Sequence, residues 1–412
     1  MDRPRALIIG GSLGGLFAAS LLRSVGWDVA IFERTTGDLA GRGAGLGARA
    51  ELFDVMRRVG IELDASLGTE VRSRIGLDRS GAPICEVPIS SVTTAWDRIY
   101  RALRAALPED CHHAGMQLQS LAQDGRKVVA CFADGTRAEG DLLVGADGIH
   151  STVRRQLLPT VAPRYAGYIS WRGVAEDDTA SLDPVVFRHM TFGFPAGELA
   201  LTVPTPAARG RSGRSPRRCH FAWFRPADYA TTLRRMCTDA RGHCHGDSIP
   251  PPLIWPELIA AMRADADALL APQIAAVIAR AERPVLHPIF DLESPRLAFG
   301  RVVLLGDAAF VARPHVGTGV TKAALDAQCL ADALAAEGND IEAAVARYDA
   351  ERRRFGAWLV ARGRYLGAWL EAQDGSDNAN ATVWRERGAE NLIREFGGAG
   401  VIEGASADRW GP

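Results

Sequence analysis

The stretch from Arg5 to Arg34 constrains the fold of this chain more than any other. Four segments have the length and composition of a strand, a turn, a helix and a second strand: 6–9, 10–15, 16–25 and 27–33. Neither strand segment has a polar face, which is typical of parallel strands that helices cover on both sides. The second strand closes on Glu33. The pattern predicts a β-α-β unit and therefore an α/β fold built on a parallel sheet.

The glycine turn of this unit has the features of a phosphate site. Gly10 permits the tight turn, Gly15 lets the helix approach the strand, and the first N–H groups of the helix favour a pyrophosphate. Ser12 takes the middle glycine position of G-x-G-x-x-G, so its hydroxyl replaces a close approach of the backbone. Glu33 follows Gly10 by about twenty residues, the offset at which a carboxylate meets ribose hydroxyls. We expect a dinucleotide here; the alternative is a glycine-rich turn without a ligand.

Composition limits the classes of partner. The chain has 412 residues and 47% hydrophobic content, enough for two domains. Its 48 basic and 49 acidic residues give a net charge of −1, which argues against nucleic acid or an anionic membrane as the main partner. No apolar run reaches the roughly 18 residues of a membrane span. The seven cysteines are scattered and form no Cys-x-x-Cys pair, which indicates reduced thiols and predicts a cytoplasmic protein.

The secondary-structure pattern changes twice along the chain. Residues 70–93 predict a hairpin that turns at 78–81, and a second hairpin turns at 134–135. Antiparallel strands are expected from about 160 to 284, at 165–174, 185–194, 199–203 and 219–225. An apolar strand at 301–307 and helices at 321–335, 341–372 and 379–396 follow. We predict a discontinuous first domain (1–70, 95–160 and 285–340), a second domain (71–94 and 161–284) and a C-terminal helical segment (341–412).

Three further segments carry weaker signals. The loop 41–47 is rich in glycine, and Arg42 within it is a candidate phosphate ligand, although a mobile surface turn is the alternative. The arginine-rich stretch 209–218 is expected to be a solvated hairpin tip. Cys237 and residues 243–245 contain sulfur and imidazole groups, but their spacing fits no zinc pattern. We therefore expect no metal.

Several motifs in one order resemble a known family. They are the turn 10–12 with Glu33-Arg34, the helix start 96–100, the strand end Asp147-Gly148, the segment 165–173 and the segment 306–315. Together they resemble the class A flavoprotein aromatic hydroxylases, the p-hydroxybenzoate-hydroxylase-like class. Within that class the chain looks most like the 2,6-dihydroxypyridine 3-hydroxylase-like enzymes. The likeness spans roughly residues 5 to 350.

The resemblance implies FAD as the cofactor and assigns residues along it. The implied fold is an FAD-binding Rossmann-like α/β domain with an inserted antiparallel-sheet substrate domain and C-terminal helices. The implied FAD ligands are Ser12 and Leu13 at the pyrophosphate, Glu33 and Arg34 at the adenosine end, Leu118 near the adenine, Asp147 near the pyrophosphate, Asp307 at the ribityl chain, Leu46 and Gly47 beside the flavin, and Pro314, His315, Gly317, Thr318 and Gly319 around the isoalloxazine. For Asp147, capping of the following helix is an equal alternative.

The implied reaction is hydroxylation of an electron-rich aromatic or N-heteroaromatic small molecule. NADPH or NADH would reduce FAD as a transient co-substrate, and O₂ would form a flavin C4a-hydroperoxide that transfers oxygen to the ring. The resemblance also leaves a homodimer open. Two rival functions remain: a flavin oxidoreductase that does not use oxygen, and a non-catalytic scaffold with an FAD-type fold.

Strand periodicity and one loop suggest where the substrate binds. Alternation places Tyr168 and Arg172 on one face of their strand, opposite Ile169 and Trp171. On the strand 219–225 it separates His220 and Phe224 from the odd-numbered residues. The candidate substrate residues are Tyr168, Trp171, His220 and Phe224. His315, which follows Pro314 in the implied flavin loop, is the candidate general base, with an expected pKa near the working pH. The alternative is that His315 only shapes the loop through hydrogen bonds.

Overall fold

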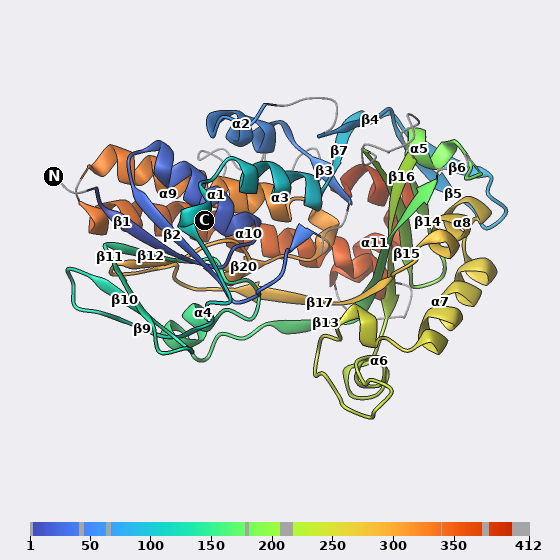
Figure 1. The fold of residues 1–412 in the computed structure, drawn as a ribbon. Helices are drawn as coiled ribbons and strands as arrows, with labels where there is room; N and C mark the ends of the chain where they lie inside the picture. Colours follow the sequence, from blue (N-terminus) through green and yellow to red (C-terminus); the bar gives the residue numbers. More distant parts are fainter. Residues whose placement is uncertain are drawn as a thin grey trace.

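A parallel sheet organises the half of the molecule that contains the N-terminus (Figure 1). The computed structural model describes residues 3–40, 45–62, 67–177, 181–206, 217–338, 340–372 and 379–397. Arg42 and most of the arginine-rich stretch 209–218 therefore lie outside the described residues.

This first sheet has the strand order β18-β19-β12-β1-β2-β8. Its strands are β1 (Arg5–Ile9), β2 (Asp28–Glu33), β8 (His112–Ala114), β12 (Leu142–Gly145), β18 (Ala298–Phe299) and β19 (Val302–Leu304). All neighbours are parallel except β18 and β19. Helix α1 (Leu13–Ser24) joins β1 to β2 and packs against α9 (Gly319–Glu337). The β-α-β unit predicted from the sequence is confirmed.

Two small sheets and three helices flank the parallel sheet. One small sheet contains β9 (Leu118–Gln123), β10 (Val128–Phe132) and β11 (Arg137–Gly140). The other contains β3 (Gly45–Ala48), β7 (Ser91–Ala95) and β4 (Thr69–Val71). The helices are α2 (Ala50–Arg58), α3 (Trp96–Ala105) and α4 (Thr152–Leu157).

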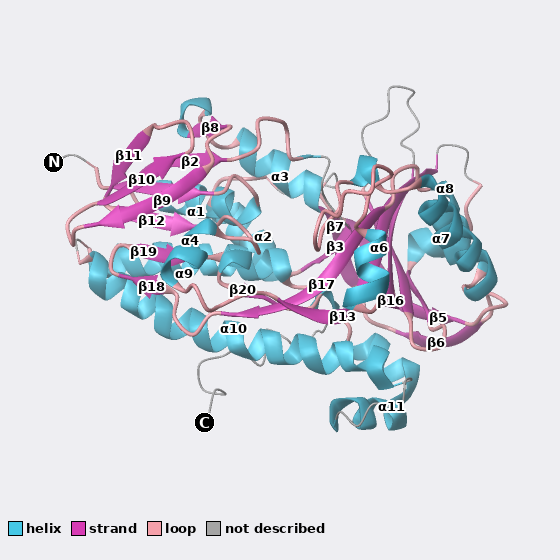
Figure 2. Cartoon of the chain, turned by 90° about the horizontal axis from the view of Figure 1, so that it is seen from below, coloured by secondary structure: helices cyan, strands magenta, loops and turns pink. Residues whose placement is uncertain are grey.

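A large, mostly antiparallel sheet forms the other half of the molecule (Figure 2). In order, its strands are β20 (Phe310–Val311), β17 (Val285–Glu293), β13 (Arg164–Asp177), β16 (Arg217–Pro226), β15 (Leu199–Thr205), β14 (Met190–Gly193), β5 (Arg74–Leu77) and β6 (Pro83–Val87). Helices α7 (Pro256–Leu269) and α8 (Pro272–Arg280) cover one face. Helices α10 (Ile341–Ala372) and α11 (Ala379–Glu395) pack on the other.

The alternation expected along β13 and β16 is confirmed. Trp171 lies opposite Trp223 in the strand register, and both belong to the buried cluster beneath α7 and α8. Tyr168 and Phe224 belong to the cluster on the other face, with residues of α10 and α11. We call this second side the inner face of the large sheet. A third buried cluster fills the parallel-sheet half. The domain boundaries themselves remain a prediction.

Two expectations about strands need correction. Residues 185–194 are not one strand: α5 (Val185–Arg188) precedes β14, because the Asp183 carboxylate accepts the Val185 N–H at 2.9 Å and Pro184 favours a helix start. The β-branched residues that suggested a strand are overridden by this local start signal. Within 70–93, only β5 and β6 form the expected hairpin, and β4 and β7 instead pair in the sheet of β3. Among the helices of the described ranges, none combines the length and apolar composition needed to cross a membrane.

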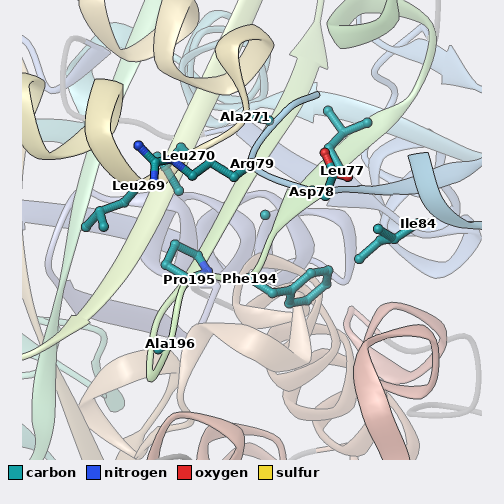
Figure 3. A pocket seen from close by; sticks show the side chains of 11 residues that line it. Leu77, Asp78, Arg79, Ile84, Phe194, Pro195, Ala196, Leu269, Leu270 and Ala271 are labelled. Carbon is teal, nitrogen blue, oxygen red and sulfur yellow. The ribbon is translucent and has the colours of Figure 1, made fainter. Parts of the chain in front are cut away.

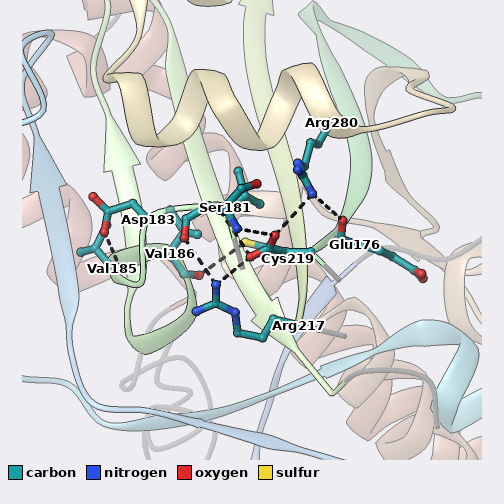
Figure 4. Close-up of polar contacts among 10 residues, drawn as sticks. Glu176, Ser181, Asp183, Val185, Val186, Arg217, Cys219 and Arg280 are labelled. Carbon is teal, nitrogen blue, oxygen red and sulfur yellow. Dashed lines mark hydrogen bonds and ion pairs between the residues drawn. The ribbon is translucent and has the colours of Figure 1, made fainter. Parts of the chain in front are cut away.

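A buried carboxylate fixes the far end of the large sheet. Asp177 ends β13, and its side chain is 0% exposed. Arg217 of β16 and Arg280 of α8 converge on this strand end (Figure 4), at 2.7 Å and 3.3 Å from the two carboxylate oxygens. The Ser181 N–H donates to it at 2.9 Å. Burial alone would raise the pKa of Asp177, but the Ser181 N–H and Arg217 outweigh burial and hold the pKa below its ordinary value.

We expect Asp177→Asn to destabilise the fold by about 2–3 kcal/mol at pH 7, because the two guanidinium groups lose their buried counter-charge. The pKa of Asp177 is lower in the folded protein than in the unfolded chain, where it is about 4. The charged carboxylate therefore stabilises the fold above about pH 4, and this stabilisation is lost as the pH falls through the pKa of the folded protein. Urea unfolding should therefore show a gap between wild type and variant that closes below about pH 4. Asp267→Asn, at an exposed position of α7, is the control. Equal unfolding free energies at pH 7 would contradict the assignment.

Candidate cofactor and substrate site

The turn after β1 has no room for side chains. Gly10 has a φ of 109°, and a Cβ atom there would lie 2.4 Å from the Ala146 carbonyl oxygen. A Cβ atom on Gly15 would lie 1.9 Å from the Gly10 carbonyl oxygen. Only glycine lets β1, β12 and α1 approach so closely. The turn leaves the start of α1 open at the carboxyl ends of the parallel strands, where ligands bind in open α/β sheets.

Two helices start beside this turn without a capping side chain. Ser12 precedes α1 and Thr318 precedes α9, and neither hydroxyl accepts a hydrogen bond from its helix. The Thr318 Oγ1 atom is buried and has no partner. A Cβ atom on Gly14 of α1 would lie 3.8 Å from the Ala323 Cβ atom of α9, so the starts of the two helices are close together. Uncapped helix starts favour anionic ligand groups.

Glu33, the last residue of β2, is hydrogen-bonded to the glycine turn that follows β1. Its carboxylate accepts the Gly11 N–H at 2.8 Å and the Thr35 N–H at 2.9 Å. Each carboxylate oxygen can accept a second hydrogen bond, so Glu33 keeps acceptor capacity for a ligand. His112 of β8 lies against Gly11, and its Nε2 atom is buried without a partner. Sequence reasoning missed His112, because the short edge strand β8 has no periodic signal of its own.

Four other predicted FAD ligands lie on or next to the strands around the turn. Leu118 is buried opposite Phe132 in the small sheet next to β2. Arg34 follows Glu33 directly, and its side chain is exposed. Leu46 and Gly47 lie on β3, and both are partly exposed. Their contacts with FAD remain predictions.

Asp147 caps a helix, as the alternative interpretation expected. Its Oδ2 atom accepts the Thr152 N–H at 2.6 Å and the Val153 N–H at 3.2 Å, at the start of α4. Its Oδ1 atom has no partner, and burial raises the pKa of this carboxyl group. Capping therefore uses one oxygen and leaves the other for a ligand donor.

The Asp307 carboxylate is exposed to solvent and lies close to the buried side chain of Lys322. The Asp307 side chain is 59% exposed, and the Lys322 Nζ atom lies 3.6 Å from its carboxylate. Lys322 is 2% exposed and donates to the Phe310 carbonyl oxygen at 2.7 Å. It is one of only two lysines in the chain. Sequence reasoning assigned Lys322 no role, because a lysine inside a helical pattern usually faces solvent.

The loop after β20 places a histidine beneath the large sheet. The short helix η6 (Pro314–Val316) ends at Gly317, whose φ is 62°. His315 is 1% exposed, and its Nε2 atom lies 2.7 Å from the Tyr168 hydroxyl. Its ring centroid is 4.6 Å from that of Phe224. The His315 Nδ1 atom is buried without a partner. The structure thus brings together three residues that were predicted separately.

The expectation that His315 has a pKa near the working pH is wrong. Burial, and then the charges of Arg313 and Arg172, lower its pKa to about 3. Burial also raises the pKa of Tyr168. Both groups are therefore neutral at pH 7. The Tyr168 hydroxyl can donate to Nε2 or accept from it. When it donates, Nδ1 carries the proton and is a free donor.

His220 lies on the same inner face, and Trp171 does not. A Cβ atom on Gly45 of β3 would lie 2.9 Å from the Cβ of His220, so the two strands are in close contact. The His220 Nε2 atom is buried without a partner, and burial followed by Arg218 lowers its pKa to about 3. Trp171 was predicted as a substrate residue, but it faces α7 and α8 on the opposite side of the sheet. The alternation of β13 excludes it from the inner face.

A surface cavity of about 350 Å³ lies elsewhere (Figure 3). The hairpin of β5 and β6, the end of β14 and the junction of α7 and α8 line it, mainly with apolar side chains such as Ile84, Phe194 and Leu269. Its acidic residue, Asp78, accepts hydrogen bonds from its own turn. The cavity shares no residue with the strand ends or with the His315 loop. Within the described ranges, no group of three His, Cys, Asp or Glu side chains is arranged to hold a metal ion.

Comparisons with known proteins agree with this geometry. A family model described as "FAD binding domain" matches residues 3–178 and 285–363, and one described as "FAD binding domain-like" matches residues 165–291. The chain is 33% identical over 333 residues to 2,6-dihydroxypyridine 3-monooxygenase of Paenarthrobacter nicotinovorans, covering 80% of this chain and 82% of that protein. It is 29% identical to the FAD-dependent urate hydroxylase of Klebsiella pneumoniae, covering 97% of each.

A solved structure is similar over nearly the whole fold. The 2,6-dihydroxypyridine-3-hydroxylase from Arthrobacter nicotinovorans superposes with a TM-score of 0.82 at 29% identity, covering 92% of this chain and 96% of that one. The chain therefore belongs to the FAD-binding-domain family that includes the class A aromatic hydroxylases.

Proposed function

We propose that this protein is an FAD-dependent monooxygenase that hydroxylates an electron-rich aromatic or N-heteroaromatic small molecule and consumes NAD(P)H and O₂. The observation that carries the proposal is the pair of uncapped helix starts, with Glu33 at one end of the region and Asp307 at the other. Relatives named for hydroxylation of dihydroxypyridine and urate support this reaction class. All seven cysteines are free thiols, which supports a reducing compartment, and we propose the cytoplasm.

The residues along the strand ends fit FAD. Glu33 would bind the adenosine ribose and the N–H groups at the start of α1 the pyrophosphate. Asp307 would bind the ribityl hydroxyls, and the start of α9 the polar edge of the flavin ring. Two buried atoms without partners, Asp147 Oδ1 and Thr318 Oγ1, lie on the loops that the cofactor would line. Buried polar groups are nearly always paired, so these atoms support a polar ligand here.

Bound FAD would supply the redox chemistry, with electrons taken from NAD(P)H and passed to O₂. One oxygen atom would enter the substrate ring and the other would leave as water. The chain's own contribution is to enclose the reacting atoms. Leu201 and Phe224 of the inner face belong to the same apolar cluster as Val316 of η6. Excluding water in this way favours oxygen transfer over wasteful release of reduced oxygen.

Two neutral imidazoles would orient the substrate. His315 Nδ1, in η6, and His220 Nε2, on β16, are both buried and unpaired. The small side chain of Ala222 lies between those of His220 and Phe224 on β16 and is partly exposed. A hydroxyl or ring nitrogen of the substrate would complete the hydrogen bonds of these atoms. Because the pKa of His315 is about 3, we assign it hydrogen bonding and not storage of a proton at neutral pH.

A substrate panel tests the function. Purified protein is incubated with pyridinols, phenols and purines, and NAD(P)H oxidation is compared with hydroxylated product in air and under argon. We expect product only in air. Turnover without oxygen and with another electron acceptor would favour the oxidoreductase alternative, and a colourless protein that takes up no FAD would favour the scaffold.

We expect Asp307→Ala to weaken FAD binding roughly 10- to 100-fold, because the ribityl hydroxyls lose a charged acceptor. The dissociation constant is measured by fluorescence titration of the apoprotein with FAD. Asp267→Ala is the matched control, since Asp267 is exposed on α7 and remote from the strand ends. An unchanged dissociation constant in the Asp307 variant would remove the ribityl assignment.

We expect His315→Ala and Tyr168→Phe to retain FAD but to lower the product formed per NAD(P)H about 10-fold. The first variant removes the Nδ1 donor, and the second removes the hydroxyl that orients the His315 ring. The pH–rate profile of the His315 variant should keep its shape between pH 5 and 9, since a histidine with a pKa of about 3 stays neutral over that range. His243→Ala, in an exposed loop, is the control. Loss of a limb near pH 6–7 would instead show that His315 titrates there.

A further inference from the structure

The end of α11 is packed against the loop that contains His315. Phe396 and Gly397 form the turn that follows the helix, and we call these two residues the α11 turn. The Gly397 N–H donates to the His315 carbonyl oxygen at 2.8 Å. A Cβ atom on Gly317 would lie 2.8 Å from the Gly397 Cα atom, so the two backbones are in contact. The α11 turn therefore borders the loop to which the proposed function assigns the flavin ring and the substrate.

Two arginines from distant elements hold the α11 turn. Arg74 of β5 is 5% exposed, and its Nη1 atom donates to the carbonyl oxygens of Phe396 and of Ile393, the latter at 2.9 Å. The Nη2 atom of Arg49, the residue before α2, donates to the Gly397 carbonyl oxygen at 3.0 Å. The last carbonyl groups of a helix have no partner within the helix, and cations are favoured beside them. These contacts fix the end of α11 in one place.

Among the described residues, three aromatic side chains surround the His315 ring. Ring centroids lie 4.6 Å (Phe224), 5.7 Å (Tyr168) and 5.7 Å (Phe396) from that of His315. Phe224 and Tyr168 lie on β16 and β13, strands that are paired on both sides. Phe396 lies on a turn instead, and its ring meets that of Phe192 on β14 edge-on at 5.5 Å. Two of the three side chains thus belong to the sheet, and the third belongs to the α11 turn.

His315 has an unused hydrogen-bonding atom inside this aromatic enclosure. Its Nδ1 atom is buried without a partner, and the residue is 1% exposed. A substrate group therefore reaches Nδ1 only by taking space beside the aromatic side chains. The strand ladders fix Phe224 and Tyr168, whereas Phe396, which is 5% exposed, depends on the hydrogen bonds of the α11 turn. The position and size of Phe396 consequently decide how much room a ring has next to His315.

We propose that Phe396 is a specificity-determining residue that limits the size of the ring that can reach His315, and that Arg74 is its positioning residue. This inference rests on the proposed function and narrows its substrate class to compounds with a single aromatic ring. Because protein interiors are close-packed, a fused second ring would overlap Phe396. The residues matched by the FAD-binding family models end at residue 363, so the α11 turn lies beyond them.

The test uses two probes that differ by one fused ring: 3-hydroxypyridine and 3-hydroxyquinoline. Their dissociation constants are measured with the FAD-loaded protein by the change in flavin absorbance, and the ratio of the quinoline constant to the pyridine constant reports ring size. For wild type we expect the single ring to bind at least about 10-fold more tightly. Phe396→Ala should lower the ratio at least about 10-fold, because it frees the space of a phenyl ring. Phe396→Trp should raise the ratio, because it fills more of that space.

The opposite directions separate a pocket wall from a purely structural role. Loss of stability alone would leave the ratio unchanged or move it in the same direction in both Phe396 variants, since both disturb the same packing. A fall in FAD affinity with an unchanged ratio would show that the α11 turn only supports the cofactor loop, and would overturn the proposal.

A second set of variants tests the role of Arg74. Arg74→Met should lower the ratio as Phe396→Ala does, because the α11 turn loses two hydrogen bonds, and Arg74→Lys should restore part of the wild-type ratio. In the Phe396→Ala background, Arg74→Met should change the ratio less than it does in wild type, because Arg74 acts through Phe396. Arg72→Met, at an exposed position just before β5, is the matched control and should keep the wild-type ratio. Equal and additive effects in both backgrounds would contradict the positioning role.

Failure of this inference differs from failure of the proposed function. A wild type that binds neither probe, or that binds the fused ring as tightly as the single one, overturns the size limit, as does an unchanged ratio in both Phe396 variants. Hydroxylated product in the substrate panel would then still support the monooxygenase. Absence of product from every compound would instead contradict the proposed function, whereas the binding ratios do not depend on turnover.

Discussion

The buried carboxylate of Asp326 holds together the elements on which both halves of the molecule depend. It lies on α9, is 2% exposed, and accepts the Gly306 N–H at 3.2 Å and the Arg352 Nε–H at 2.7 Å. Those two contacts join α9 to the turn after β19 and to α10. An isolated buried carboxylate would be unstable, but one paired with a guanidinium and a backbone N–H fixes the geometry around it. Asp307, the proposed ribityl ligand, directly follows Gly306. The hydrogen bond from the Gly306 N–H to Asp326 therefore also fixes the position of Asp307.

Helix α10, which the contact between Arg352 and Asp326 fixes to α9, contacts both halves of the molecule. Tyr348, in its first half, donates to the Leu304 carbonyl oxygen of β19 at 2.7 Å. Phe355 and Leu359, further along, belong to the cluster beneath the large sheet. Near its end, Glu371 contacts Arg313, which also pairs with Asp291 of β17. The loop that contains His315 is therefore fixed by one rigid helix between the parallel strands and the inner face.

Much of this arrangement was predictable from local pattern. The glycine turn, the β-α-β unit and the alternation along β13 and β16 each depend on residues close in sequence, and the structure bears them out. The errors arose where a distant contact decides. Trp171 is an exception, because the alternation along its own strand already indicates that it lies on the face opposite Tyr168. The pKa of His315 depends on enclosure by Phe224 and on charges from Arg313 and Arg172, none of which is near it in sequence except Arg313. The sequence around Lys322 and His112 has no periodic pattern that would distinguish a buried polar side chain from a solvent-exposed one.

Burial has opposite consequences for the charge of the histidine side chains and for the charge of the Arg172 guanidinium. A histidine that is taken out of water gives up its proton, so His220, His287 and His315 become neutral hydrogen-bonding groups. An arginine keeps its charge even when its pKa falls to about 10, because that value still lies well above neutrality. Arg74 and Arg172 therefore keep their charge in the same sheet in which the imidazoles of His220 and His287 are neutral.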